Sequence, residues 1–389
     1  MLVSSIYAHN FKTLLHFNLR LAPFTCLIGL NGAGKSTVLQ FVDFLAQQAR
    51  GDLEGWLDQR GWQAGELDSR LVPQKNIDFK IELSDGEAGA VTWYGSFNTT
   101  SLRCSTERVE TRTATLQVHD GTYQISEPRE STGAMSVTVA RSGRIEFNYQ
   151  GSILSQLREQ TLPESLRHFK RYLTSITPLL LLSPQHLHQR ARESRGSLGL
   201  GGEKLSAYLY EMDPADRQRL AEQLKHVYPN LFELQPRSTR SGVKRLEIEE
   251  RYGERKIRTE ARHVNDGLLR LTAILAELLG DRPLLLFDEI ENGINPELVE
   301  FLLRSMLSAR QQVLVTTHSP LILNYLSDEQ ARAGVVYLHR DAGGATRAVH
   351  FFSIPSLAKK LTVMGPGEAF VDTNLTELEA EIRAMPSGS

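Results

Sequence analysis

The stretch from Gly29 to Thr37, GLNGAGKST, constrains the fold of this chain more than any other. It fits the pattern G-x-x-x-x-G-K-[ST] at every fixed position. In such a loop the backbone passes close around a polyphosphate, and side chains at Gly32 and Gly34 would obstruct that approach. The N–H groups of the loop and the start of the following helix then point at the negative charge. The motif therefore predicts a phosphate-binding loop between a strand and a helix.

The residues around and within this loop support that prediction. The apolar run from Phe24 to Ile28 indicates a buried strand, and apolar residues recur at helical spacing from Val38 to Leu45. A glycine-rich turn that matched the motif by chance would lack both neighbours. Lys35 brings a full cation to the β- and γ-phosphates, and the Ser36 hydroxyl can ligate Mg²⁺. The predicted phosphate contacts are Asn31, Gly32, Ala33, Gly34, Lys35, Ser36 and Thr37.

Length, charge and cysteine content exclude several classes of protein. The chain has 389 residues, of which 41% are hydrophobic and 23% charged, as is ordinary for a globular protein, and its length suits one or two domains. The net charge of −2 does not indicate nucleic-acid binding, which would need a local basic surface. Cys26 and Cys104 lack metal-ligand spacing and suit a reducing cytosol. The N-terminus is unlike a signal peptide and no apolar stretch could span a bilayer, so a cytoplasmic protein without a membrane partner is predicted.

The hydrophobic periodicity changes along the chain and predicts an α/β fold. From 76 to 150 apolar and polar residues alternate, which is typical of an antiparallel β meander with one buried face. The continuous apolar run from Pro178 to Ser183 predicts a central parallel strand. Residues 186–235 are expected to be mostly helical and charged, with a break at the Gly-rich Gly196–Gly202, and a short hairpin is expected over 244–258. Over the last third of the chain, the pattern predicts three helices, Gly267–Leu279, Pro296–Ala309 and Leu375–Ala384. It also predicts four strands, Pro283–Phe287, Gln312–Thr317, Val335–His339 and Arg347–Phe352.

Two of these later strands end in residues suited to phosphoryl transfer. Asp288 and Glu289 follow the apolar strand Leu284–Phe287, so Asp288 would emerge beside the phosphate loop and hold Mg²⁺. Glu289 can accept a proton from a water that attacks the γ-phosphate. His318 follows the strand Val313–Thr317 and can hydrogen-bond that phosphate or the water. The plainer alternatives are two surface carboxylates after a core strand, and a capping or core histidine.

Together these motifs resemble the ABC-type ATPase heads of the RecF/SMC class. They are close to the short predicted ATPases found beside or fused to nucleases in OLD-type and anti-phage systems. The phosphate loop is similar to Walker A, Asp288-Glu289 to Walker B, and Thr317–Pro320 to the switch-histidine loop. Asn10–Lys12 resembles the N-terminal NFK element, and Glu291–Pro296 resembles the D-loop. The resemblance implies a mostly parallel core sheet, ATP and Mg²⁺ as cofactors, and Mg²⁺-dependent ATP hydrolysis as the activity.

The resemblance also implies site residues outside the Walker motifs. Gln185 resembles the Q-loop glutamine, which touches Mg²⁺ and senses the γ-phosphate. Asn265 and Gly267 resemble the signature, in which a Ser and a Gly of one subunit contact the γ-phosphate bound to another. Asn265 stands where Ser is usual and can still donate a hydrogen bond, while Asn295 replaces the usual D-loop His. The implied catalytic residues are Glu289, His318 and Lys35, and the implied metal ligands are Ser36, Asp288 and Gln185.

Partners and domains follow from the same resemblance. Because a signature cannot reach its own nucleotide, ATP would join two heads in a homodimer or higher oligomer, and hydrolysis would release them. Between Gln185 and Asn265 there is no room for the coiled-coil arms of SMC proteins, and the tail lacks a nuclease-like carboxylate cluster. Any nuclease is therefore expected in a separate effector subunit. The implied domains are an ATPase lobe (1–185 and 264–352), a helical signature lobe (186–263) and a C-terminal tail (353–389).

The macromolecule on which such a head acts is left open. A basic run from Arg237 to Arg262 is interleaved with glutamates, so a solvated hairpin laced with ion pairs and a sequence-independent DNA contact are equally favoured. The main hypothesis is an ATP-hydrolysing head that acts on DNA or regulates an effector nuclease in anti-phage defence or DNA repair. A low-turnover, ATP-sensing scaffold is the alternative. The nucleotide-binding subunit of a membrane transporter is disfavoured by the β meander.

Overall fold

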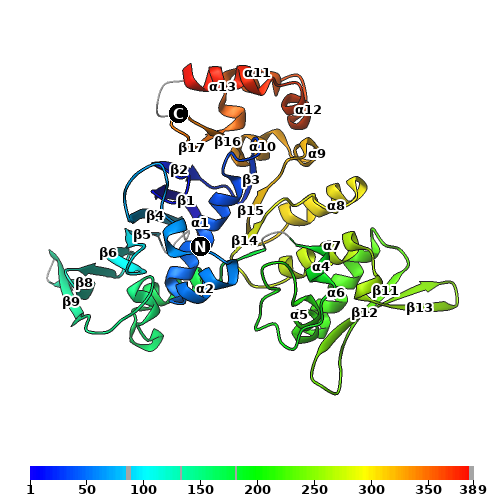
Figure 1. The fold of residues 1–389 in the computed structure, drawn as a ribbon, viewed down its shortest axis with the longest axis horizontal. Helices are drawn as coiled ribbons and strands as arrows, with labels where there is room; N and C mark the ends of the chain where they lie inside the picture. The colour runs from blue at the N-terminus through cyan, green and yellow to red at the C-terminus, as the bar shows by residue number, and fades with distance from the viewer. Residues whose placement is uncertain (85–88, 132–133, 180–181, 385–389) are drawn as a thin grey trace. The chain divides into compact units, whose positions relative to one another are not determined.

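The protein has an α/β fold of two compact units, each built from segments that are distant in sequence (Figure 1). The computed structural model describes residues 1–84, 89–131, 134–179 and 182–384. Unit 1 comprises residues 1–176, 334–351 and 383–389, and unit 2 comprises 177–333 and 352–382. In the described part of the chain, no helix is long and apolar enough to cross a membrane.

The larger sheet of unit 1 is antiparallel and contains the predicted meander. Its strands lie in the order β2-β1-β4-β5-β6-β7-β8-β9, so from β4 onward each strand pairs with the next in sequence. Ile77, Phe79 and Ile81 are buried in β4 while their neighbours are more exposed, as the alternation predicts. The strands are β1 (Leu2–His9), β2 (Phe17–Arg20), β4 (Asn76–Ser84), β5 (Ala90–Asn98), β6 (Arg103–Glu110), β7 (Thr115–His119), β8 (Thr122–Ser131) and β9 (Ala134–Arg144).

A second group of strands in unit 1 carries the phosphate loop. Strand β3 (Phe24–Ile28) is buried at every residue and pairs in parallel with β16 (Val335–Arg340), which pairs antiparallel with β17 (Thr346–His350). The loop follows β3 and leads into α1 (Lys35–Arg50). The strand–loop–helix arrangement of the motif is therefore present. The other helices of this unit are α2 (Leu53–Arg60) and α3 (Glu164–Ser175), with 3-10 turns η1 (Ala64–Glu66), η3 (Ile153–Ser155) and η4 (Glu159–Thr161).

Aromatic side chains around α1 form the centre of the core of unit 1. The ring of Phe11 lies 5.3 Å from the rings of both Phe41 and Phe44, measured between centroids. Phe44 also meets Phe97 of β5 edge-on at 5.0 Å. All four side chains are fully buried. Because each buries a large apolar area, they fix the turn after β1 and the sheet against the helix that follows the loop.

Unit 2 contains three parallel strands in the order β10-β14-β15. They are β10 (Thr177–Leu179), β14 (Leu284–Phe287) and β15 (Gln312–Thr316). The prediction of a central strand over Pro178–Ser183 is wrong, because β10 lies at the end of the strand order among the described residues. Leu180 and Leu181 of that run lie outside the described residues. A continuous apolar run indicates burial but does not specify which strands pair with it.

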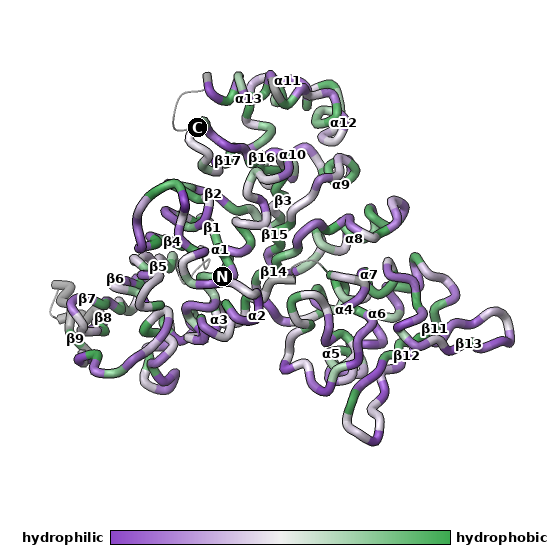
Figure 2. Tube along the Cα trace, viewed as in Figure 1, coloured by the Kyte–Doolittle hydropathy of each residue, from purple (hydrophilic) through white to green (hydrophobic). Residues whose placement is uncertain are grey.

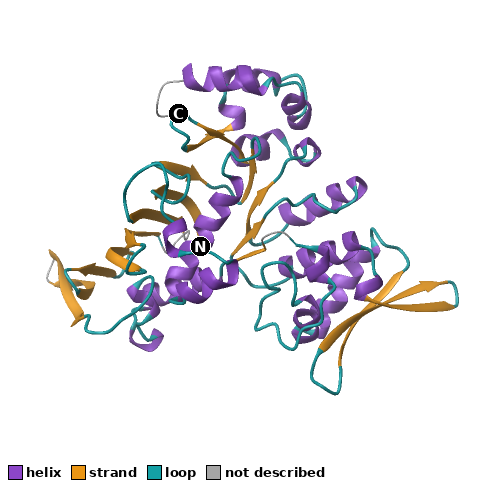
Figure 3. Ribbon diagram, in the orientation of Figure 1, coloured by secondary structure: helices purple, strands orange, loops and turns teal. Residues whose placement is uncertain are grey.

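Helices and a small antiparallel sheet form the rest of unit 2 (Figure 3). The expectation that 186–235 is mostly helical is wrong, because 188–204 forms no helix and 231–235 belongs to β11. The sheet contains β11 (Leu231–Ser238), β12 (Lys244–Tyr252) and β13 (Arg255–Glu260), and Figure 2 shows the hydrophilic character of the β12–β13 hairpin. The remaining helices of the chain are α4 (Pro184–Leu187), α5 (Leu205–Glu211), α6 (Pro214–Lys225), η5 (Ala261–His263), α7 (Asp266–Leu278), α8 (Pro296–Leu307), α9 (Pro320–Asn324), α10 (Asp328–Gly334), η6 (Phe351–Ser353), α11 (Pro355–Lys360), α12 (Pro366–Val371) and α13 (Leu375–Ala384).

Candidate active site

Close backbone approaches shape the loop from Gly29 to Thr37. Gly34 caps the N-terminus of α1 with a φ of 107°, and a Cβ at this position would lie 2.4 Å from Thr346 Oγ1. A Cβ at Gly29 would lie 2.2 Å from the carbonyl oxygen of Leu338. Glycine is therefore required at both positions by contact with β16 and β17, in addition to any contact with a ligand.

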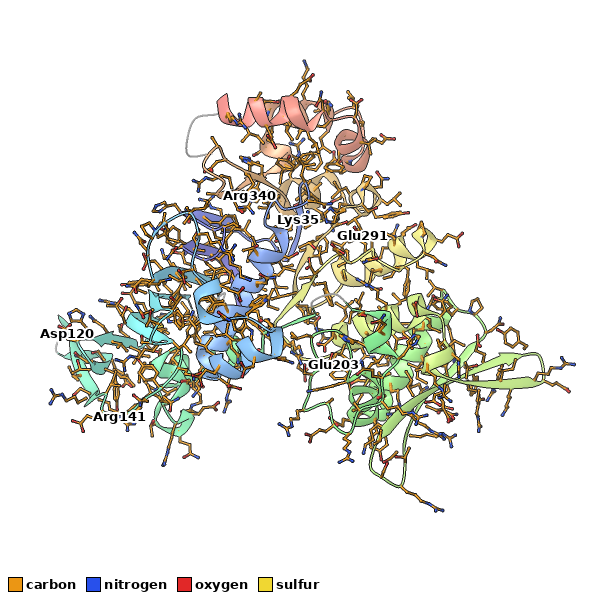
Figure 4. All side chains as sticks on the ribbon, viewed as in Figure 1. Lys35, Asp120, Arg141, Glu203, Glu291 and Arg340 are labelled. Carbon is orange, nitrogen blue, oxygen red and sulfur yellow. The ribbon has the colours of Figure 1, made fainter. Side chains whose placement is uncertain are left out.

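Side chains from β16 and β17 hold the loop from outside. Arg340 Nε donates to the carbonyl oxygen of Gly32 at 2.9 Å, and Thr346 Oγ1 donates to that of Ala33 at 3.0 Å. Lys35, which is labelled in Figure 4, is buried, and its Nζ donates to the carbonyl oxygens of Gly29 at 2.9 Å and Leu30 at 3.2 Å. These bonds fix the curvature of the loop. Sequence analysis missed Arg340 and Thr346, which come more than 300 residues later in the chain.

The Asn10–Lys12 element ties a neighbouring segment to the loop helix. Asn10 is fully buried, its Oδ1 accepts from Ser69 N at 3.0 Å, and its Nδ2 donates to the carbonyl oxygen of Asn76 at 2.8 Å. Lys12 Nζ donates to Gln40 Oε1, a side chain of α1, at 2.8 Å. The element therefore holds the segment before β4 in place beside the helix that starts at the phosphate loop.

In unit 2, the ends of β14 and β15 bring predicted site residues together. Thr316 Oγ1 donates to Asp288 Oδ1 at 2.5 Å and accepts from the N–H of Glu289 at 2.8 Å. His318 Nε2 lies 3.7 Å from Glu289 Oε1, and the N–H of His318 donates to Glu291 Oε1 at 2.7 Å. This proximity arises because β14 and β15 are adjacent parallel strands whose carboxyl ends meet at one edge. The sequence points to Glu291 only as the first residue of the D-loop-like element, and it does not point to Thr316.

The backbone of Glu289 is strained. Its φ of 49° lies in the left-handed region, which costs a non-glycine residue about 1–3 kcal/mol and persists only where the surrounding structure holds the residue there. Thr316 binds its N–H, and Arg270 Nη2 donates to its carbonyl oxygen at 2.7 Å. Its carboxylate is partly exposed and accepts from Asn292 Nδ2 at 3.3 Å. The backbone is therefore fixed while the carboxylate remains accessible.

Arg270 connects three of the predicted motifs. It lies in α7, one turn after the signature-like residues, and is 4% exposed. Its Nη1 donates to the carbonyl oxygen of Leu182, just before the predicted Q-loop, and its Nη2 donates to Glu289. Burial lowers the pKa of Arg270, whereas the carboxylates of Glu291, Glu289 and Asp288 raise it. The role of Arg270 cannot be recognised from the sequence, because both of its acceptors are backbone carbonyls.

The signature-like residues stand at the start of α7. Asn265 caps this helix, since its Oδ1 accepts from the N–H groups of Gly267 at 2.8 Å and Leu268 at 3.2 Å. Asn265 is exposed, and its Nδ2 is a further hydrogen-bond donor at the start of the helix. His188 Nε2 lies 2.9 Å from Asp266 Oδ1, so the carboxylate at the helix start has a partner within the same unit.

The predicted site residues are divided between the two units. Lys35 and Ser36 belong to unit 1 with the rest of the loop, and the others belong to unit 2. Within unit 2 the structure joins Asp288, Glu289 and His318, and Arg270 links them to the helix that starts after Asn265. Gln185 is exposed in the short helix α4. The assembly of both sets into one site stays a prediction.

The predicted metal ligands are chemically suited to Mg²⁺. Ser36 offers a hydroxyl, Gln185 an amide oxygen and Asp288 a carboxylate, which are the hard oxygen donors that magnesium prefers. Among the described residues there is no group of three or more His, Cys, Asp or Glu side chains that could hold a metal by itself. The three donors, one carboxylate, one amide oxygen and one hydroxyl, fit a Mg²⁺ ion that takes its further oxygen ligands from a bound polyphosphate.

The basic run of β11–β13 is extensively paired with glutamates. Arg237 and Arg245 both contact Glu247, at 3.1 and 3.0 Å. Arg251 and Arg258 both contact Glu249, at 3.3 and 3.0 Å, and these hydrogen bonds lower the pKa of that carboxyl, Arg258 most. Pairing of this kind favours the solvated hairpin over a surface for DNA phosphates, because much of the positive charge is already compensated.

Comparisons with known proteins agree with the fold and the motifs. Residues 1–105 match the AAA ATPase domain family, and residues 164–324 match an AAA domain family of the AbiEii-toxin type, from type IV toxin–antitoxin systems. No curated protein matches the chain.

Two solved structures of SMC heads show a similar fold. One is an SMC head bound to the C-winged-helix domain of ScpA, with 14% identity and a TM-score of 0.54, covering 90% of this chain and 97% of that chain. The other, from Pyrococcus furiosus, is an SMC head with an extended coiled coil bound to the C-terminal domain of ScpA, with 12% identity, a TM-score of 0.53 and coverage of 90% and 96%. At these identities the similarity shows the fold alone. Together with the AAA matches over 1–105 and 164–324, each of which covers less than half of the chain, this fold supports an ABC-type ATPase head related to the ATPases of defence systems.

Proposed function

We propose that this chain binds ATP with Mg²⁺ and hydrolyses it. The observation that carries the proposal is the pairing of Glu289 with His318 on a Glu289 backbone held in a strained conformation. Strained residues cluster at functional sites, where the surrounding structure holds a side chain in position for its chemistry. The AAA family matches and the phosphate-loop motif support ATP as the nucleotide.

The residues divide the work of phosphoryl transfer between them. Lys35 neutralises negative charge on the β- and γ-phosphates. Glu289 accepts a proton from a water whose oxygen forms a bond to the γ-phosphorus, while the bond from that phosphorus to the β–γ bridging oxygen breaks and ADP leaves. His318 donates a hydrogen bond to a γ-phosphate oxygen. Bound Mg²⁺ supplies further charge neutralisation, and the residues that would hold it are Ser36, Asp288 and Gln185.

Pairing of two heads through ATP is part of the same proposal. In it, the ATPase lobe (1–185 and 264–352) binds the nucleotide, and Asn265 and Gly267 of one head contact the γ-phosphate bound to the other. The exposed position of Asn265 at the start of α7, where its Oδ1 caps the helix and its Nδ2 is a hydrogen-bond donor, supports this role. The similar SMC heads are bound to domains of ScpA, which supports a protein partner for this chain as well. We expect that partner to be a separate effector subunit that carries any nuclease activity, with DNA as an alternative partner, in anti-phage defence or DNA repair.

Two substitutions test the ATPase and the pairing separately. Lys35→Ala should abolish Mg²⁺-dependent release of phosphate from ATP. Glu289→Gln should retain ATP, lower turnover by roughly 10²–10⁴-fold and remain paired, because it loses the proton acceptor but not the binding residues. Light scattering with saturating ATP measures the pairing, and Glu297→Gln, at an exposed position of α8, is the matched control.

Each outcome contradicts a different part of the proposal. Full turnover by Lys35→Ala would contradict ATP hydrolysis at this loop. A Glu289→Gln protein that stayed monomeric with saturating ATP would contradict pairing of identical heads. A wild-type protein that bound ATP and paired, but showed only background turnover alone and with DNA, would establish the ATP-sensing scaffold instead.

A further inference from the structure

Tyr228 lies beside the residues at the start of α7 that are proposed to contact ATP. It sits in the turn between α6 and β11, where its N–H donates to the carbonyl oxygen of Leu224 at 2.8 Å and its own carbonyl oxygen accepts from the N–H of Leu231 at 2.9 Å. Its hydroxyl oxygen would lie 3.8 Å from a Cβ at Gly267. Tyr228, Gly267 and Asn265 all belong to unit 2, so this arrangement lies within one compact body.

Two backbone donors at this helix start already have an acceptor. Asn265 Oδ1 accepts from the N–H groups of Gly267 at 2.8 Å and Leu268 at 3.2 Å. Gly267 is also buried, and a Cβ at this position would lie 3.1 Å from the carbonyl oxygen of Gly293. A phosphate that approaches the start of α7 therefore needs hydrogen-bond donors from side chains.

The Tyr228 hydroxyl is such a donor. Tyr228 is half-buried, and its hydroxyl makes no hydrogen bond to any other group in the described part of the chain. Burial raises the pKa of Tyr228, so the hydroxyl keeps its proton at neutral pH. Phosphate oxygens accept from a protonated hydroxyl, and the negative charge of the phosphate strengthens the bond.

Packing holds the turn that carries Tyr228 against the neighbouring helices. The preceding helix, α6, packs on α7 and buries Leu220 and Leu224. His226, two residues before Tyr228, stacks on Phe301 of α8 with 6.4 Å between the ring centroids. A side chain that is positioned in this way loses little conformational freedom when it binds, so more of its hydrogen-bond energy remains as affinity.

We propose that the Tyr228 hydroxyl of one head donates a hydrogen bond to the γ-phosphate of the ATP bound to the other head. This role rests on the proposed pairing of two heads through ATP. Two side-chain donors, the Asn265 amide and the Tyr228 hydroxyl, then meet that phosphate. Because the pair is symmetric, the contact forms twice. ADP has no γ-phosphate, so release of phosphate after hydrolysis removes both contacts and favours separation of the heads.

The test measures pairing and nucleotide affinity separately in Tyr228→Phe, which keeps the ring and loses only the hydroxyl. The full chain carries Glu289→Gln as well, so that ATP is retained. Light scattering over a series of protein concentrations gives the Kd of the ATP-bound pair. This Kd should rise at least about tenfold, because each pair loses two hydrogen bonds to a charged group.

The affinity of a single head for ATP should not change. Titration of a fluorescent ATP analogue into protein dilute enough to remain unpaired gives this second Kd, and Tyr228 does not contact the nucleotide of its own head. The matched control is Tyr252→Phe in β12, an exposed tyrosine whose hydroxyl donates to Glu250 Oε1 at 3.2 Å. It should leave both constants unchanged.

The outcomes separate the role of Tyr228 from the proposed function. Weaker pairing in Asn265→Ala with unchanged pairing in Tyr228→Phe overturns the role of Tyr228 alone. An equal loss of affinity for ATP in the unpaired Tyr228→Phe head also overturns it, because the hydroxyl would then act within its own head. A Glu289→Gln chain that bound ATP without pairing would overturn the proposed pairing of identical heads, and one that bound no ATP would overturn the proposed function itself.

Discussion

Replacing Arg270 tests how unit 2 holds its predicted catalytic glutamate. The guanidinium reaches two carbonyl oxygens at once, those of Leu182 and Glu289, each at 2.7 Å. A lysine ammonium has a single nitrogen and cannot span both acceptors, so Arg270→Lys keeps the charge but loses one hydrogen bond. Arg270→Met loses both hydrogen bonds and the charge.

The expected magnitudes follow from the burial of this side chain. Arg270 is 4% exposed, so water does not replace the lost hydrogen bonds. A hydrogen bond from a charged donor contributes about 1.5–3 kcal/mol, and Arg270→Lys should lower the free energy of unfolding by that amount. Arg270→Met also removes the cation that faces Asp288, Glu289 and Glu291, and should cost about 3–5 kcal/mol. Typical domains have only about 5–15 kcal/mol of stability, so both losses are measurable.

Urea unfolding and steady-state ATP turnover are the assays. Because the Glu289 carbonyl is released and its strained backbone can relax, kcat should fall at least about tenfold in Arg270→Lys while the affinity for ATP stays the same. The matched control is Arg304→Lys, since Arg304 is 73% exposed, contacts Glu300 and should change stability by less than about 0.5 kcal/mol. If Arg270→Lys behaved like this control in both assays, the reasoning that Arg270 holds Glu289 would be refuted.

Two further expectations concern unit 1. Gly34→Ala should weaken ATP binding at least about tenfold in titration calorimetry, because its φ of 107° and a Cβ 2.4 Å from Thr346 Oγ1 force the loop to move. The control is Gly61→Ala, at a φ of 64° with open space around it, which should leave the affinity for ATP unchanged. Equal losses of affinity in the two variants would contradict the steric argument. Burial raises the pKa of Glu107 from 4.5 to about 7. The folded protein therefore holds this proton more tightly than the unfolded chain, and the resulting stability is complete below pH 4.5 and is lost as the pH rises through about 7. Relative to Glu107→Gln, the wild type should lose about 3 kcal/mol of unfolding free energy between pH 4.5 and 8, and parallel pH profiles in urea unfolding would count against a buried neutral carboxyl.

The features that could be predicted from the sequence are those that depend on neighbours along the chain. The strand, loop and helix from Phe24 to Arg50 each carry their own hydrophobic pattern, so their order was readable without knowledge of the fold. That Glu289 and His318 each come just after an apolar strand can be read in the same way, whereas the pairing of those two strands, which brings the residues together, is seen only in the structure.

Long-range hydrogen bonds to backbone carbonyls could not be predicted in this way. Arg340 and Gly32 are 308 positions apart, and Arg270 and Leu182 are 88 positions apart. A carbonyl acceptor is present at every residue, so the acceptor's position leaves no mark in the sequence. The same limit explains the misplaced strand at Pro178, since hydrophobicity indicates burial and not the identity of the neighbouring strand.

Backbone strain and side-chain chemistry coincide at two places in the described residues. Lysine and glutamate rarely adopt positive φ, yet Lys12 has a φ of 48° and Glu289 a φ of 49°. Lys12 binds Gln40 of the helix that follows the phosphate loop, and Glu289 faces His318. Strain alone does not identify a site, because Leu102 and Arg195 share this backbone region and belong to neither place. Backbone strain costs about 1–3 kcal/mol at each position, so contacts elsewhere must offset it. At Lys12 they include the hydrogen bond to Gln40 and the cation–π contact with Trp62. At Glu289 they are the hydrogen bonds that Thr316 and Arg270 make to its backbone, which leave the carboxylate facing His318.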